Sequence, residues 1–119
     1  MEALTTSVPV LDHAQLKDIT LDDPDLMREI LAALIDDTGR QIELLGRAIQ
    51  EHDSQRTVRL AHYSKGACAN VGAVSAATLL KGIEVDASQD RFEACSSALA
   101  NLVTELDRLR VEAGALVAS

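Results

Sequence analysis

Apolar residues recur every three or four positions along most of this chain, the spacing that gathers them on one face of an α-helix. The longest stretch of this kind begins after Asp22-Asp23-Pro24 and runs to about Glu51. An aspartate before the first turn and a proline within it are typical of a helix start. We therefore predict one long amphipathic helix, with the periodic positions Met27, Ile30, Leu31, Leu34, Ile35, Ile42, Leu45, Ala48 and Ile49.

A second long stripe occupies the C-terminal part of the chain. It starts near Ser88 to Asp90 and ends at about Leu116, and its spacing alternates between three and four. This spacing is typical of a helix that packs nearly antiparallel with its neighbours. The core positions predicted for this helix are Phe92, Cys95, Leu99, Leu102, Leu106, Leu109, Ala113 and Leu116.

Two shorter helices are predicted between the long ones. Asp53 or Ser54 can cap the first of them, and Gly72 is expected to end it, because glycine is favoured where the chain turns left-handed. The second starts at about Ala73 and carries Glu84 near its end. Because all four helices are joined by short turns, we expect neighbouring helices to be antiparallel.

The N-terminal part is less regular. Residues 1–10 show little periodicity, so we predict a flexible tail there, followed by a short helix from Asp12 to about Ile19. The fold class that we predict is all-α: an up-down antiparallel four-helix bundle with a short additional N-terminal helix, formed by residues 11–119. The composition agrees, since nearly all apolar residues are Leu, Ile, Val and Ala, with one Tyr, one Phe and no Trp.

Charge and apolar runs exclude several classes of partner. The formal net charge of −8 disfavours nucleic acid, whose phosphates select basic surfaces. There is no apolar run near the length of a membrane span, and the start of the chain lacks a secretory pattern. We therefore expect a cytoplasmic protein, in which Cys68 and Cys95 are small buried thiols rather than a disulfide.

Candidate chemistry lies in the helix between Asp53 and Gly72. At about 100° per residue, Ser64 falls on the buried side and His62 points outward. Lys65 follows one turn later, and the glycine Gly66 clears the approach at the fourth position, at some cost to the helix. Neutral imidazole is a competent nucleophile near neutral pH, because histidine side chains ordinarily have a pKa of about 6.5. Either a phosphoryl-accepting site or an ordinary surface histidine fits this pattern.

Residues 61–67, which read Ala-His-Tyr-Ser-Lys-Gly-Ala, resemble the motif of the histidine-containing phosphotransfer domains of multi-step two-component relays. The resemblance continues in residues 70–73, Asn-Val-Gly-Ala, and in the Asp-Pro helix start at residues 22–26. It covers the chain from about Val10 onward. One position departs from the family pattern: Ser64 stands where leucine is usual. A buried hydroxyl there is expected to bond back to the carbonyl of Leu60.

The resemblance implies a phosphorelay intermediate. His62 would accept a phosphoryl group from the aspartate of one receiver domain and pass it to another receiver. Lys65 and Arg59 would stabilise the transferring charge, and Glu84 would orient the imidazole. The implied partners are response-regulator receiver domains and a hybrid sensor kinase. No cofactor or metal is expected in this chain, and Mg²⁺ is expected on the receiver.

The resemblance also implies a docking surface around the histidine. Gly66 and Ala69 would leave room for the receiver, and Val58 and Tyr63 would offer apolar contact beside Arg59. We expect the bundle to be a monomer. Because the chain begins with methionine and contains one complete bundle, we also expect a standalone protein rather than a fragment of a hybrid kinase.

Without a glycine-rich loop or P-loop, the chain is predicted to be a phosphate carrier and not an enzyme with its own kinase domain. Two other function classes stay open. The alternative is a non-catalytic docking module that binds a receiver or another signalling partner without carrying phosphate. A metal site or histidine hydrolase is the weakest reading, because no second histidine or paired nucleophile accompanies His62.

Overall fold

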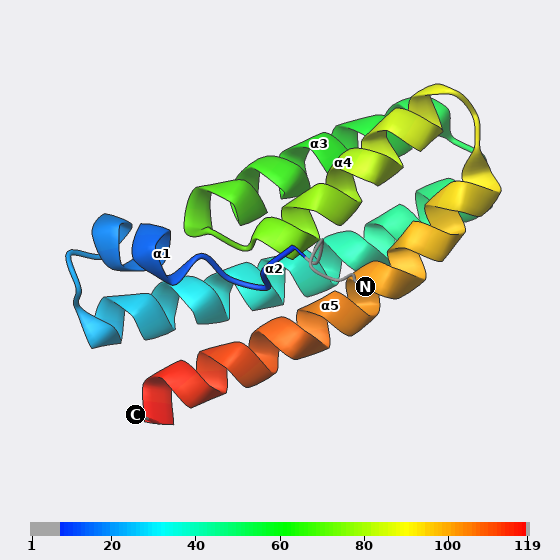
Figure 1. The fold of residues 1–119 in the computed structure, drawn as a ribbon. Helices are drawn as coiled ribbons and strands as arrows, with labels where there is room; N and C mark the ends of the chain where they lie inside the picture. The colour runs from blue at the N-terminus through cyan, green and yellow to red at the C-terminus, as the bar shows by residue number, and fades with distance from the viewer. Residues whose placement is uncertain (1–7, 119) are drawn as a thin grey trace, which may run out of the picture.

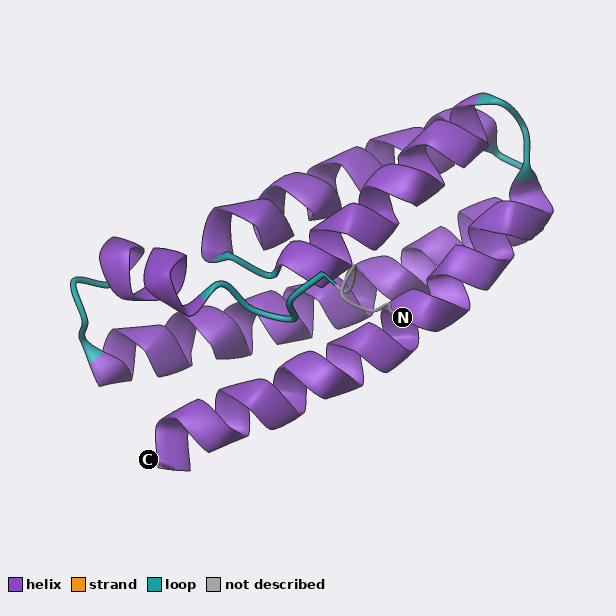
Figure 2. Cartoon of the chain, viewed as in Figure 1, coloured by secondary structure: helices purple, strands orange, loops and turns teal. Residues whose placement is uncertain are grey.

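The structure, a computed structural model, describes residues 8–118. Helices are the only regular elements in this range (Figure 2), which confirms the predicted all-α class. They are α1 (His13–Ile19), α2 (Pro24–Gln50), α3 (Ser54–Val71), α4 (Val74–Ser88) and α5 (Phe92–Ala118). Helices α2 to α5 form an antiparallel bundle, and the short α1 lies at the end where α2 begins (Figure 1).

Local capping explains the starts of the first three helices and the end of α3. Asp12, Asp23 and Asp53 each accept backbone N–H bonds at the start of α1, α2 and α3. Gly72 ends α3 in the left-handed conformation with φ of 93°, and an added Cβ would approach the Asp12 carbonyl oxygen to 3.0 Å. Of the two caps predicted for α3, Asp53 is the one observed, because its side chain accepts the N–H of Arg56. The hydroxyl of Ser54 instead donates to the carbonyl of Ala87 at 2.6 Å.

The last helix begins slightly later than predicted. Asp90 has a positive φ of 58°, and the N–H of Arg91 returns to the carbonyl of Asp86 at 2.9 Å, so the chain completes a turn before α5 starts at Phe92. Within the turn, Arg91 also pairs with the Asp86 carboxylate at 3.2 Å. This turn holds α4 and α5 side by side in opposite directions (Figure 1).

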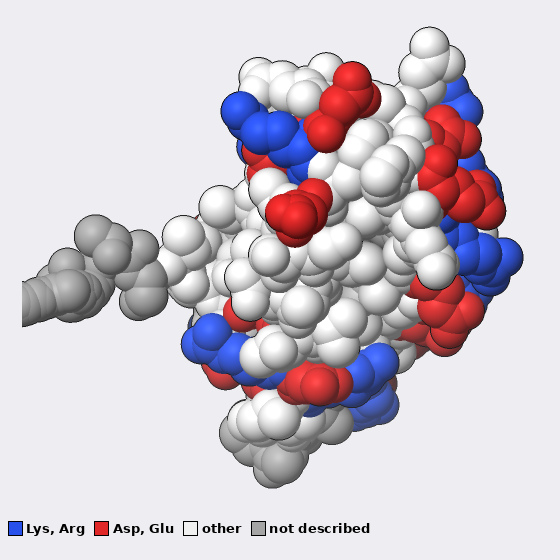
Figure 3. Space-filling model, turned by 90° about the vertical axis from the view of Figure 1, so that its right-hand side faces the viewer, with Lys and Arg blue, Asp and Glu red and all other residues white. Residues whose placement is uncertain are grey.

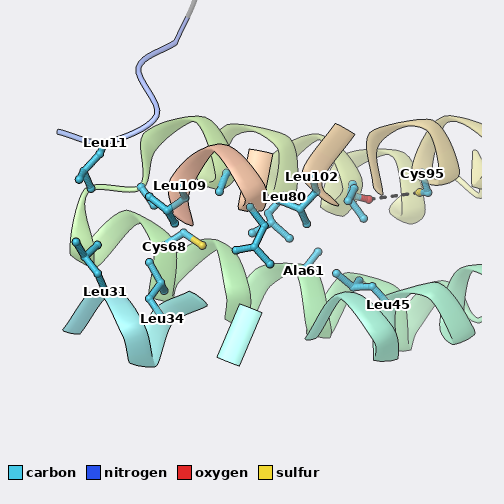
Figure 4. Close-up of a cluster of buried hydrophobic side chains, with 14 of the residues drawn as sticks. Leu11, Leu31, Leu34, Leu45, Ala61, Cys68, Leu80, Cys95, Leu102 and Leu109 are labelled. Carbon is cyan, nitrogen blue, oxygen red and sulfur yellow. Dashed lines mark hydrogen bonds between the residues drawn. The ribbon is translucent and has the colours of Figure 1, made fainter. Parts of the chain in front are cut away.

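Leucines and small side chains from all four long helices fill the core (Figure 4). Cys68 and Cys95 are buried free thiols, as predicted. Burial raises the pKa of both thiols, which keeps them protonated near neutral pH. The Cys68 sulfur lies 3.8 Å from the Thr38 hydroxyl, and Cys95 donates to the carbonyl of Ile83 at 3.7 Å.

Ser64 is buried, as the helical pattern predicted, but the expected bond to Leu60 is not formed. Its hydroxyl oxygen has no hydrogen-bond partner within residues 8–118. A helix carbonyl can accept both a backbone N–H and a hydroxyl, as that of Asp53 does from Thr57, so the bond is missing because the Ser64 oxygen is not placed within reach of the Leu60 carbonyl. The prediction of this local bond was therefore wrong.

The predicted N-terminal tail lies mostly outside the described residues, which begin at Val8. The carbonyl of Pro9 accepts the backbone N–H of Ser75 at 3.0 Å, and the N–H of Asp12 donates to the carbonyl of Gly72 at 2.7 Å. These bonds fasten the entry to α1 onto the turn between α3 and α4. None of the helices in the described range has the length and apolar character needed to span a membrane.

Candidate functional site

His62 lies near the middle of α3 with 67% of its side chain exposed. The opposite face of α3 is buried in the bundle, and its buried residues are Thr57, Ala61, Ser64 and Cys68. This arrangement agrees with the outward direction that the sequence predicted for the imidazole. The helix backbone therefore presents His62 to a partner without exposing the core.

Glu84 of α4 reaches across to the histidine. Its Oε2 lies 2.9 Å from Nδ1 of His62, and its Oε1 lies 2.7 Å from Nζ of Lys65. The Glu84 and Lys65 side chains are 20% and 24% exposed, much less than His62. One carboxylate thus binds both the imidazole and the ammonium, so Glu84 brings together the three residues that the sequence predicted for the chemistry.

The charges in this cluster fix the protonation of the carboxylate. The hydrogen bond from Lys65 is the largest influence and holds the pKa of Glu84 below its ordinary value; burial opposes this shift and the contact with His62 adds to it. An ionised carboxylate can only accept hydrogen bonds, so the bonded Nδ1 of His62 carries the proton. In the neutral imidazole the lone pair is then on Nε2.

The two basic residues predicted near His62 have different surroundings. Lys65 is engaged with Glu84, whereas no carboxylate of residues 8–118 forms an ion pair with the exposed Arg59. On the helix, Arg59 and Lys65 lie about 60° to either side of His62. The site is therefore asymmetric, with its engaged cation toward α4 and its free cation toward α2.

The predicted docking positions surround this cluster. Apart from its chain neighbours and the backbone of its own helix, an added Cβ at Gly66 would meet nothing within 4 Å, so the space above this residue is open. Ala69 and Arg59 are exposed, and Val58 is half-buried with its side chain against the core. Tyr63 is 55% exposed, and it is the only tyrosine of the chain.

Asp37 of α2 is a contact that sequence reasoning missed. The Tyr63 hydroxyl donates to its Oδ2 at 3.2 Å, and this bond, together with the carboxylate charge, raises the pKa of the tyrosine. Arg40 lies 3.7 Å from the other carboxylate oxygen and pairs with Asp36 at 2.6 Å. The antiparallel pairing of α2 and α3 is the only sequence signal that could have brought Asp37 to Tyr63, and it does not fix their register.

The other two histidines have structural contacts. His13 of α1 lies 3.0 Å from Glu112 of α5, and the ring of His52 stacks on Phe92 with centroids 4.5 Å apart and an interplanar angle of 3°. Within the described part of the chain, no group of three or more His, Cys, Asp or Glu side chains has an arrangement that could hold a metal ion.

Comparisons with known proteins add a family and a fold. The Hpt domain model matches residues 29–112. The chain is similar to the histidine-containing phosphotransfer protein B of Pseudomonas aeruginosa PAO1, with 25% identity and a TM-score of 0.82 over 91% of this chain and 94% of that one. A histidine-containing phosphotransfer protein of Medicago truncatula shares the fold, with 24% identity and a TM-score of 0.79 over 90% and 76% of the two chains. No curated protein sequence matches the chain.

Proposed function

This chain belongs to the Hpt domain family of phosphorelay intermediates, and from that membership we propose that His62 is its phosphoryl-accepting residue. The observation that carries the proposal is the 2.9 Å contact between Nδ1 of the exposed His62 and Oε2 of Glu84. This contact occupies one ring nitrogen and leaves Nε2 as the nucleophile. The phosphoryl donor and acceptor are the aspartates of two receiver domains.

The transfer is an in-line displacement. The lone pair of Nε2 attacks phosphorus, the new N–P bond forms, and the P–O bond to the receiver aspartate breaks with its electron pair returning to the carboxylate. The proton on Nδ1 stays in its bond to Glu84, which stabilises the positive charge that the ring acquires as the lone pair is used. Passing the group to the next receiver reverses these steps.

Lys65 acts on His62 indirectly, through Glu84. Its ammonium favours the ionised carboxylate, and this carboxylate in turn holds the imidazole in the tautomer with a free Nε2. Arg59, which is exposed and has no ion pair among residues 8–118, is the cation available to the arriving phosphoryl group. Mg²⁺ is supplied by the receiver, whose aspartate carries the phosphoryl group, and this chain acts as a carrier between its partners.

The test is phosphoryl transfer from receiver domains charged on their aspartate, chosen from the same genome, to the wild-type chain and to His62→Gln. We expect a label on the wild type that resists base, is lost in acid and is absent from His62→Gln. Nitrogen NMR of the labelled ring should place phosphorus on Nε2. If receivers bind the chain but never label it, the non-catalytic docking module is the correct function.

A further inference from the structure

Tyr63 is an aromatic side chain held beside the phosphoryl-accepting histidine by a different helix. One residue along α3 turns its direction by about 100° from His62, away from the Glu84 and Lys65 pair and toward α2. Its hydroxyl donates to Oδ2 of Asp37, so the ring is fixed against α2 while 55% of the residue remains exposed. His62 therefore lies between Lys65, which is bound by Glu84 of α4, and Tyr63, which is bound by Asp37 of α2.

A fixed exposed tyrosine is suited to binding a protein partner. Tyrosine is enriched among the residues that contribute most to interfaces, since it buries a large area and immobilises few torsions. The bond to Asp37 restricts the ring before the partner arrives, which lowers the entropy cost of docking. Arg59, four residues earlier on the same side of α3, adds a free positive charge beside the ring.

We propose that Asp37 is a positioning residue that fixes Tyr63 as an anchor for the receiver, so that the partner covers the α2 side of His62. This inference rests on the proposed function and adds which flank of the site selects the partner. The receiver surface that fits there has an apolar side chain for the Tyr63 ring and a carboxylate for Arg59. Asp36 lies next to Asp37 but does not contact Tyr63: it pairs with Arg40.

The experiment measures the apparent KM and kcat of transfer from a charged receiver to wild type, Asp37→Ala, Tyr63→Phe and the double variant. Asp36→Ala is the matched control, because it removes the same charge from the neighbouring position of α2. Labelling by phosphoramidate, a small donor that loses ammonia as its phosphoryl group moves to the imidazole, reports access to His62 without a receiver.

We expect Asp37→Ala and Tyr63→Phe each to raise the apparent KM for the receiver by about threefold to tenfold, the effect of one lost hydrogen bond. The labelling rate with phosphoramidate is the reference for access to His62 in each variant. The double variant should match the single ones, because both changes break the same bond. Asp37→Asn, which keeps an acceptor oxygen, should restore most of the affinity, and kcat at saturation should be little changed.

An unchanged KM for Asp37→Ala, an equal effect of Asp36→Ala, or additive effects in the double variant would overturn this inference while leaving the relay function intact. If charged receivers do not label the wild type although phosphoramidate does, the relay function fails and the inference fails with it. The two failures are therefore distinguished in the same set of measurements.

Discussion

The Glu84 carboxylate binds both His62 and Lys65, so its protonation depends on whether the chain is folded. Lys65 holds the pKa of Glu84 below its ordinary value, so the unfolded chain binds a proton there more readily than the folded chain. The resulting stability is present above about pH 4.3, the ordinary glutamate pKa, and is lost as the pH falls through the lowered pKa. Urea unfolding of wild type and Glu84→Gln should show a stability difference that shrinks on acidification. A difference independent of pH would contradict this linkage.

Gly66 stabilises α3 less than alanine would, but it leaves space at the proposed docking surface. The methyl group of alanine at this position would meet nothing within 4 Å beyond its chain neighbours and its own helix backbone, and alanine would gain up to about 1 kcal/mol of helix stability. Its methyl group would, however, project into the space that we propose for the receiver. We expect Gly66→Ala to raise the unfolding free energy and to slow receiver-dependent labelling about tenfold, as overpacking of an interface does.

Gly82→Ala is the control for this prediction. Gly82 is also a helical glycine with nothing within 4 Å of an added Cβ, but it belongs to α4 and is outside the predicted docking positions. It should give the same gain in stability and normal labelling. Normal labelling of Gly66→Ala would show that the open space above this glycine is not used.

Two buried hydroxyls of α3 should respond in opposite directions to their removal. Ser64 has an oxygen without a partner in the described range, and Thr57 donates to the carbonyl of Asp53 at 2.7 Å. Leaving a buried polar group unsatisfied costs about 1–3 kcal/mol, whereas a made bond contributes about 1 kcal/mol. We therefore expect Ser64→Ala to raise the unfolding free energy and Thr57→Val to lower it. Thermal or urea unfolding measures both, and a loss of stability in Ser64→Ala would show that its hydroxyl is satisfied in solution.

The elements themselves were predictable because their signals are local. An aspartate caps each of the first three helices, Gly72 supplies the left-handed turn, and the apolar stripes have the helical period. The start of α5 was less predictable, since Asp90 adopts a positive φ that sequence patterns do not favour for aspartate over glycine. The contact between Glu84 and His62 came only from the family resemblance, because the register between two helices is set by their packing.

Besides the backbone bond between Asp12 and Gly72, one side chain of the short helix α1 binds the end of α3. The side-chain Nε2 of Gln15 donates to the carbonyls of Ala69 and Asn70 at 2.7 and 3.2 Å, and the Ala69 carbonyl also accepts the backbone N–H of Gly72 at 3.2 Å. Gln15→Ala should lower the unfolding free energy by about 1 kcal/mol and speed amide exchange in the last turn of α3 and in α1.

Gln50→Ala, at an exposed position of α2, is the comparison for Gln15→Ala. It removes the same side chain without removing a donor from α3, so exchange in the last turn of α3 should stay at the wild-type rate. Equal exchange in both variants would mean that α1 is held by the backbone bonds of Asp12 and by the pair of His13 with Glu112 instead.

The net charge of the whole molecule opposes the approach of an acidic receiver to the proposed docking surface. The chain has a formal net charge of −8, and on the face seen in Figure 3 acidic and basic residues alternate around a broad uncharged area instead of forming one basic surface. A receiver that carries a net negative charge is therefore repelled at long range. Attraction begins only when Arg59 reaches the carboxylates of its partner.

This difference in range predicts an unusual dependence on salt. At about 0.15 M ionic strength the Debye length is about 8 Å, so salt removes the repulsion between the two molecules more than the attraction at contact. Stopped-flow association with a receiver of negative net charge should become faster as NaCl is raised from low ionic strength. Arg59→Gln should bind more weakly than wild type at every salt concentration but keep the same upward slope. If association instead slows with salt, a local basic surface, and not the net charge, governs the encounter from long range.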